Sequence, residues 1–213
     1  MHLKYLAIGI VVAVAPLSAS AIYSNLGPGQ SYLSAGFFSS SGSNPLYQGT
    51  EFIATSSANL STVLVPVEST DGLLTFGLYS DSSGTPGTLL ESWSSVTVPT
   101  NFSTFSLTTL TSVVNPLLSS GDTYWFLSST VPSDGPRSLG WESNNQSIAG
   151  GLWAGSSPTG LSQVNPASPA PAIELDSATS TSTTPEPASW LMVAAGLIGS
   201  LYWRRRSVDS KAR

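Results

Sequence analysis

Carboxylates are the side chains of this 213-residue chain that could carry acid–base chemistry. Glu51, Glu91 and Glu142 lie on or beside segments that we expect to be strands. Hydrolysis of a glycosidic bond requires two carboxyl groups about 5 to 10 Å apart, and Trp141 could support a sugar ring beside Glu142. Because nothing in their spacing is diagnostic, solvated charges on strand faces are the simpler interpretation. We predict no catalytic residue.

The missing residue types exclude most other catalytic chemistry. Cysteine is absent, and His2 is the only histidine. Lys4 and Lys211, the two lysines, stand near the ends of the chain. Between residues 22 and 184 there is therefore no Ser-His-Asp triad, cysteine nucleophile, histidine-ligated zinc or Schiff base.

Calcium is the one metal for which turn residues offer oxygen ligands. The candidates are Asp81-Ser82-Ser83-Gly84 and Asp134-Gly135. Neither continues into the twelve-residue calcium loop, because the later acidic ligands are missing. We interpret both aspartates as turn formers, and we predict no metal site and no cofactor.

Four tryptophans between residues 22 and 184 could either pack in a core or stack on sugar rings. Trp125, between Tyr124 and Phe126, is typical of a core, as is most of this group, which also includes Trp93. Trp141 and Trp153 have more polar, loop-rich surroundings. If the chain binds a glycan, we expect these two residues to contact it.

The charge of the same region limits its partners. Residues 22–184 hold ten acidic residues and a single basic one, Arg137, for a net charge of −9. Nucleic acid binding rests on lysine and arginine contacts with phosphate, so we predict no nucleic acid partner. The abundant serine, threonine, glycine and asparagine suggest a neutral, hydroxyl-rich exterior.

The elements that must position these side chains are short β-rich runs separated by turn residues such as Asp71-Gly72 and Asp134-Gly135-Pro136. This pattern predicts an all-β domain over residues 22–176, a β-sandwich or jelly roll. Pro66 within one run suggests an edge strand or a bulge. The expected strands are 31–38, 47–54, 60–67, 73–80, 88–94, 103–107, 123–130, 138–142, 148–153 and 172–176.

The N-terminal 21 residues resemble a secretory signal peptide. Lys4 precedes an apolar stretch, and Ala19-Ser20-Ala21 is a small-x-small cleavage pattern. We expect the Sec-type export machinery to be a partner and cleavage to follow Ala21, leaving Ile22 as the mature N-terminus. A retained anchor is less favoured because the apolar run is short and ends at Pro16.

The C-terminal residues contain three features in a fixed order. Pro185-Glu186-Pro187 precedes an apolar run at 188–203, and Arg204-Arg205-Arg206 follows it within a basic tail, 204–213. A transmembrane helix over 188–203 would reach roughly 24 Å, against about 30 Å of hydrocarbon. The arginines favour a cytoplasmic C-terminus. Residues 177–184 are a hydroxyl-rich spacer.

This tail, residues 184–213, resembles the PEP-CTERM sorting signal of Gram-negative bacteria. The resemblance implies recognition by an integral-membrane exosortase, processing near Pro185-Glu186-Pro187, and delivery to the cell surface or into extracellular polymer. The protein would be anchored in the membrane only transiently. An ordinary C-terminal anchor would need the helix and arginines but no Pro-Glu-Pro triplet.

A second resemblance covers roughly residues 31–176. The runs that carry it are Leu78-Tyr79-Ser80-Asp81-Ser82-Ser83-Gly84-Thr85-Pro86-Gly87, Val114-Asn115-Pro116-Leu117-Leu118 and Gly121-Asp122-Thr123-Tyr124-Trp125. They are similar to the choice-of-anchor R type of bacterial surface domain, which implies a β-sandwich and offers no catalytic residues.

Two functions of different class follow from these observations. The favoured one is a non-enzymatic surface or matrix protein with adhesive, structural or glycan-binding work, for which extracellular polysaccharide is the candidate partner. The alternative is a secreted carbohydrate-active enzyme that uses two carboxylates.

Overall fold

The β-rich runs form strands because alternation places every second side chain on one face. The computed structural model describes residues 20–41, 45–100, 102, 106–130 and 137–178. Across these residues the regular elements are thirteen β-strands, with no α-helix. The all-β prediction is therefore confirmed.

The thirteen strands of the described residues are numbered in chain order. They are β1 (Ala21–Ser24), β2 (Leu33–Ser41), β3 (Tyr47–Ile53), β4 (Ala58–Ser69), β5 (Leu73–Asp81), β6 (Pro86–Thr97), β7 (Leu107–Thr111), β8 (Leu117–Leu118), β9 (Thr123–Thr130), β10 (Arg137–Ser143), β11 (Leu152–Gly155), β12 (Leu161–Val164) and β13 (Glu174–Ser177).

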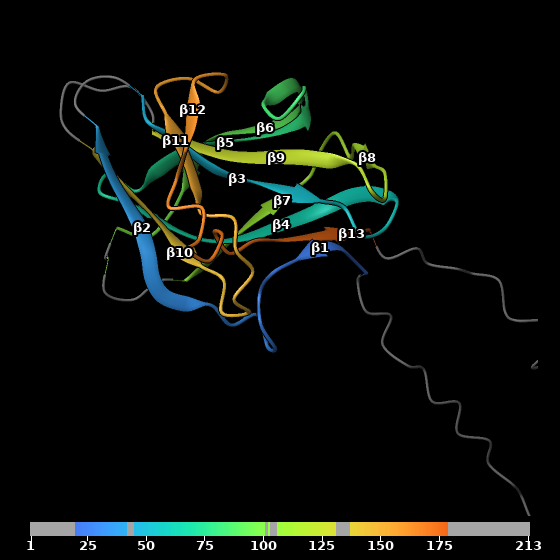
Figure 1. Ribbon diagram of the computed structural model, residues 1–213, viewed down its shortest axis with the longest axis horizontal. Coiled ribbons are helices and arrows are strands. Elements are labelled where there is room, and N and C mark those ends of the chain that lie inside the picture. Colours follow the sequence, from blue (N-terminus) through green and yellow to red (C-terminus); the bar gives the residue numbers. More distant parts are fainter. Residues whose placement is uncertain (1–19, 42–44, 101, 103–105, 131–136, 179–213) are drawn as a thin grey trace, which may run out of the picture. The chain divides into compact units, whose positions relative to one another are not determined.

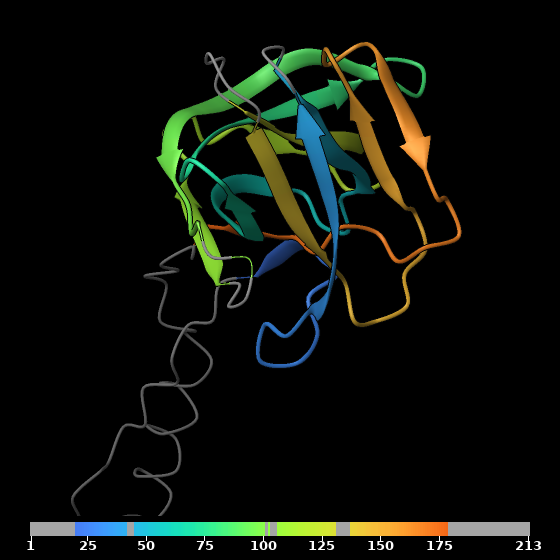
Figure 2. The ribbon, with the colours of Figure 1, turned by 90° about the vertical axis from the view of Figure 1, so that its left-hand side faces the viewer.

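Two antiparallel sheets divide these strands between them. One sheet has the order β12-β11-β3-β9-β5-β6. The other has the order β1-β13-β4-β10-β2, with β7 and β8 also paired to the long strand β4. Figure 1 shows β3 and β9 lying over β4 and β13, and Figure 2 shows β11 and β12 as a neighbouring orange pair.

The core lies between the two sheets. Val63, Val65 and Val67 of β4 are buried at alternate positions, as period-two side-chain placement requires. The rings of Phe126 on β9 and Trp141 on β10 meet edge to face with centroids 6.1 Å apart. Because these strands belong to opposite sheets, this contact closes the predicted β-sandwich.

Most predicted strands are present, with differences at their ends. The segments predicted at 47–54 and 123–130 correspond to β3 and β9 almost residue for residue. The prediction at 148–153 is displaced, because the strand there is β11. Of the segment predicted at 103–107, residues 103–105 lie outside the described residues, and β7 begins at Leu107. Sequence reasoning missed β1, β8 and β12, which are at most four residues long and too short for a repeating pattern.

Ser18–Thr179 forms one compact unit. Ala21 begins β1 and Ser177 ends β13, so ordered structure enters the predicted spacer by one residue. The predicted transmembrane helix 188–203 and basic tail 204–213 lie outside the described residues. Within the described part of the chain, no helix is long and apolar enough to cross a membrane.

Candidate functional site

Trp141 is a core residue. Its side chain has no exposed surface, and its indole Nε1 donates a hydrogen bond to the carbonyl oxygen of Ala172 at 2.9 Å. A sugar cannot stack on a ring that is covered on both faces. The predicted glycan contact at Trp141 is therefore wrong, because its strand neighbours indicated polarity but not the direction of the ring.

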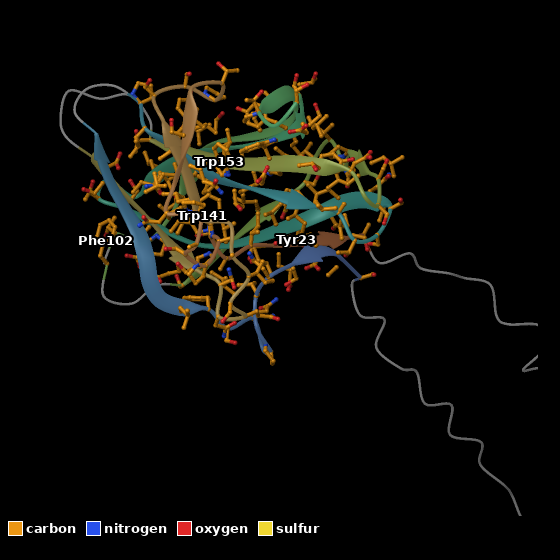
Figure 3. The ribbon with its side chains drawn as sticks, viewed as in Figure 1. Tyr23, Phe102, Trp141 and Trp153 are labelled. Atoms are coloured by element: carbon orange, nitrogen blue, oxygen red, sulfur yellow. The ribbon has the colours of Figure 1, made fainter. Side chains whose placement is uncertain are left out.

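Trp153 occupies a different environment on β11 (Figure 3). It is half-buried and faces away from the core, on the outer face of the six-stranded sheet. Its ring meets Trp125 edge to face at 5.0 Å, and Trp125 donates from Nε1 to Asp81 Oδ1 at 2.8 Å. Trp153 is thus placed where a ligand could reach it, which is compatible with the predicted contact.

Asp81 acts as a turn former, as expected from its sequence neighbours. Both of its carboxylate oxygens accept a hydrogen bond from the Gly84 amide, at 3.1 and 3.2 Å. These bonds and the one from Trp125, which is the largest contribution, lower the pKa of Asp81 below its ordinary value. Among the described residues, no three acidic side chains gather to hold a metal ion.

The outer face of the six-stranded sheet forms regular cross-strand rows. Phe126 and Ser128 of β9 point inward, so Trp125, Leu127 and Ser129 point outward. The outward rows across β3, β9 and β5 are Tyr47, Ser129 and Thr75; then Gly49, Leu127 and Gly77; then Glu51, Trp125 and Tyr79.

A groove of about 170 Å³ opens on this face. One glycine, Gly77, lines it in the middle row, where the face would otherwise carry a larger side chain. The ring of Tyr79 lies directly over Gly77, because a Cβ added to Gly77 would stand 2.6 Å from that ring. The lining residues are Tyr47, Thr75, Phe76, Gly77, Tyr79, Leu89, Ser92, Ser94, Leu127, Ser128 and Ser129.

Tyr47 and Tyr79 give the groove its aromatic walls. Both are half-buried. Burial, with a smaller electrostatic contribution from Tyr47, raises the pKa of the Tyr79 hydroxyl above its ordinary value. Tyr79 is therefore neutral across the physiological pH range and keeps its hydroxyl proton for donation. The sequence holds no signal that these two tyrosines share one groove.

The three glutamates considered for acid–base chemistry lie in three separate places. Glu51 is exposed on the outer face of the six-stranded sheet. Glu142 is buried on β10, on the opposite side of its strand from the core residue Trp141. Glu91 is buried on β6, where it faces the β7–β8 connection. The structure brings no two of them together as a catalytic pair.

Glu91 clamps the connection between β7 and β8. One carboxylate oxygen accepts from the Ser112 hydroxyl at 2.5 Å, and the other accepts from the amides of Val113 and Val114 at 2.6 and 3.2 Å. Ser112 in turn accepts from the amide of Asn115, whose φ of 52° is positive. Glu91 thus joins β6, at the edge of the six-stranded sheet, to the β7–β8 connection of the other sheet.

Glu68 is a buried carboxylate that sequence reasoning did not single out. On β4 it pairs with Gly140, and Glu142 follows two residues further along β10 on the same face. Both glutamates raise the pKa of the nearby Tyr32 hydroxyl, after the larger effect of its burial. Because Glu68 and Glu142 are at most 1 % exposed, a substrate has no access to them.

The sorting residues Pro185, Glu186, Pro187 and Arg204–Arg206 lie outside the described residues, as does Ala19 of the signal cleavage pattern. Ala21 is described, and its carbonyl oxygen accepts a hydrogen bond from the Ser56 hydroxyl at 3.2 Å. The next residue, Ile22, is fully buried.

Comparison with known families identifies the tail. The model of the PEP-CTERM protein-sorting motif matches residues 183–206. No curated protein and no solved structure matches the chain. The resemblance to the choice-of-anchor R domain stays a prediction, because the matched family model covers only the tail.

These findings define an exported protein with an all-β ectodomain and a C-terminal sorting signal. More specifically, the chain carries the PEP-CTERM motif of exosortase substrates, which are processed by exosortase and sorted to the cell surface in Gram-negative bacteria.

Proposed function

We propose that this chain is a non-enzymatic component of the cell surface or extracellular matrix whose ectodomain associates with extracellular polysaccharide. The observation that supports the proposal is the outer face of the six-stranded sheet. There an open groove combines two tyrosine rings with serine and threonine hydroxyls. Aromatic faces and hydroxyl groups are the surfaces that complement the C–H faces and hydroxyl rim of a sugar.

The route to that location follows from the two ends of the chain. Sec-type export would release the ectodomain after cleavage at the Ala19-Ser20-Ala21 pattern. The helix predicted over 188–203 would then hold the precursor in the membrane until exosortase acts near Pro185-Glu186-Pro187. A short anchor suits a temporary attachment, since it barely spans the hydrocarbon.

A carbohydrate-active enzyme is the competing function, and the positions of the carboxylates weigh against it. Glu51 is the one exposed glutamate of the three candidates. The carboxylate of its acidic neighbour, Asp81, already accepts hydrogen bonds from Trp125 and Gly84. Glu142 has no open path to a substrate because it is buried.

Turnover and binding assays separate the two functions. The mature protein is incubated with a panel of polysaccharides, and reducing ends and bound protein are measured for the wild type, Glu51→Gln and Glu142→Gln. We expect binding without release of reducing ends in all three proteins. Sugar turnover that is lost in either variant would overturn the proposal in favour of the enzyme.

A further inference from the structure

We propose that the groove between Tyr47 and Tyr79 binds one pyranose ring of an uncharged polysaccharide chain that runs across the six-stranded sheet. This inference rests on the proposed function and deepens it, because it names the binding residues and the class of polymer. Tyr47 and Tyr79, which lie on the opposite sheet, take the place of Trp141 as the expected glycan contacts.

The shape of the groove favours one ring of a longer chain. Its volume of about 170 Å³ is below the roughly 300 to 1,000 Å³ of sites that enclose a drug-sized ligand. The groove lies on a sheet face, and its rim includes Leu89, which is half-exposed at 49 %. A polymer can therefore extend beyond the groove along the sheet face. A small free ligand would be contacted by the protein on one side only.

The chemistry of the lining suits a sugar ring. Tyr47 and Tyr79 present apolar ring surface that can stack on C–H groups, and each ends in a hydroxyl. Thr75, Ser92 and Ser94 add hydroxyls that both donate and accept hydrogen bonds. Such groups match sugar hydroxyls, which also donate and accept, without selecting for charge.

The charges on the face favour an uncharged polymer. Glu51 stands in the same row as Tyr79 and Asp81 lies two residues beyond Tyr79, while the residues that line the groove include no lysine or arginine. A uronate or sulfated chain would meet repulsion without a compensating cation. We therefore expect discrimination against anionic polysaccharides.

Trp153 provides a second contact point along the same face. It pairs with Gly49 on β3, and Gly49, Leu127 and Gly77 continue that row to the groove. Three strand spacings of about 4.8 Å separate β11 from β5, so Trp153 lies roughly 14 Å from Gly77. A chain that occupies the groove and crosses the strands would reach the Trp153 ring.

Affinity electrophoresis of the mature protein tests the inference. The gels contain a neutral glucan, galactan or mannan, and a gel with the anionic polymer alginate serves as the comparison. We expect retardation by at least one neutral polymer and none by alginate, with little change between 0.05 and 0.5 M NaCl. Tyr47→Ala and Tyr79→Ala should weaken binding at least tenfold, and Trp153→Ala should weaken binding of the polymer more than of a disaccharide.

Further variants separate a lost site from a lost fold. Tyr79→Phe keeps the ring and should keep most of the affinity. Gly77→Val would displace the Tyr79 ring and fill the groove, so it should abolish binding. Leu117→Ala, which alters an exposed residue of β8 on the other sheet, is the matched control and should bind like the wild type. Near-ultraviolet circular dichroism of each variant reports whether the native packing is retained.

The outcomes distinguish this inference from the proposed function. Equal binding by the wild type, Tyr47→Ala and Tyr79→Ala would overturn the groove while leaving polysaccharide association intact. Preference for alginate, or binding to none of the neutral polymers, would also overturn the groove inference. Absence of the wild-type protein from the polymer fraction of its host would instead contradict the proposed function itself.

Discussion

Glu91 and Glu68 are two buried glutamates with opposite surroundings. Glu91, 4 % exposed, accepts hydrogen bonds from one hydroxyl and two backbone amides. Glu68 has no exposed surface, and among the described residues neither of its carboxylate oxygens has a hydrogen-bond partner. A buried polar group stabilises the fold only when it is paired. The same substitution should therefore have opposite effects at these two positions.

Glu91→Gln should lower the free energy of unfolding by about 1 to 3 kcal/mol, because charge-assisted hydrogen bonds to the β7–β8 connection are weakened. Urea denaturation at pH 7 measures the change. The exposed Glu51→Gln is the control. An unchanged midpoint for Glu91→Gln would mean that the clamp contributes nothing to stability.

Glu68→Gln should raise the free energy of unfolding at pH 7 by about 1 kcal/mol, since a neutral amide is less costly to bury than a carboxylate. Burial raises the pKa of Glu68 above its ordinary value, so the folded state takes up its proton more readily than the unfolded state. The free-energy cost of burying the Glu68 carboxylate is present at pH values above the raised pKa of the folded state. This cost disappears as the pH falls below the ordinary pKa of glutamate. Denaturation curves from pH 3 to 8 should show the two proteins converging in acid, and a pH-independent difference would contradict this assignment.

Tryptophan placement shows where residue-level prediction ends. Trp125 was expected in the core and is fully buried, although it points outward and is covered in part by Trp153. Trp141, predicted to contact a glycan if the chain binds one, is in the core. Neighbouring residue types indicate how polar a strand is, but the sheet that covers each face is set by distant residues.

At the scale of the elements, β4 contains Pro66 although it is an interior strand of its sheet. Pro66 suggested an edge strand or a bulge, yet β4 pairs with four other strands. Its residues 60–64 pair with β13 and residues 67–69 pair with β10. Pro66 lies between these two ladders, where a missing N–H interrupts neither of them.

β1 and β13 bring the two ends of the described chain together. Ser20 accepts hydrogen bonds from the amide and hydroxyl of Ser177 at 3.0 and 2.8 Å. The Ser56 hydroxyl donates to the carbonyl oxygen of Ala21. Cleavage after Ala21, as predicted from the sequence, would remove these acceptors from the mature domain.

A protein that begins at Ile22 should therefore be less stable than one that begins at Ser20, by about 1 to 2 kcal/mol for the lost hydrogen bonds. Thermal unfolding of the two proteins, each produced without the signal segment, measures the difference. Ser177→Ala should reduce the difference in stability between the two N-termini, because that variant lacks the hydroxyl donor to the Ser20 carbonyl oxygen. Identical unfolding curves for the two N-termini would contradict a structural role for Ser20 and Ala21.

At the scale of the whole molecule, charge is separated along the sequence. Residues 22–184 carry a net charge of −9, while residues 204–213 contain five basic residues and one acidic residue. The five basic residues of the tail agree with the positive-inside rule, which counts lysine and arginine. The acidity of residues 22–184 makes an uncharged polymer a better partner than an anionic one.

Replacing Arg204, Arg205 and Arg206 together by glutamine should reduce surface delivery several-fold, because the charges that hold the tail on the cytoplasmic side would be lost. Mass spectrometry of the C-terminus and the protein content of the surface fraction give the readout. Replacing Lys211 and Arg213 by glutamine is the control and should have a smaller effect. A triple variant that still ends near Pro185 and reaches the surface normally would refute a role for these arginines.

The sequence by itself determined the sorting signal and the fold class. Both depend on local order: three features in succession in the tail, and period-two runs between turn residues. Only the tertiary structure decided which carboxylates are buried, which tryptophan is accessible, and that Tyr47 and Tyr79 share a groove. Those properties arise because strands far apart in the sequence pair side by side, as β3, β9 and β5 do, and no local pattern records such neighbours.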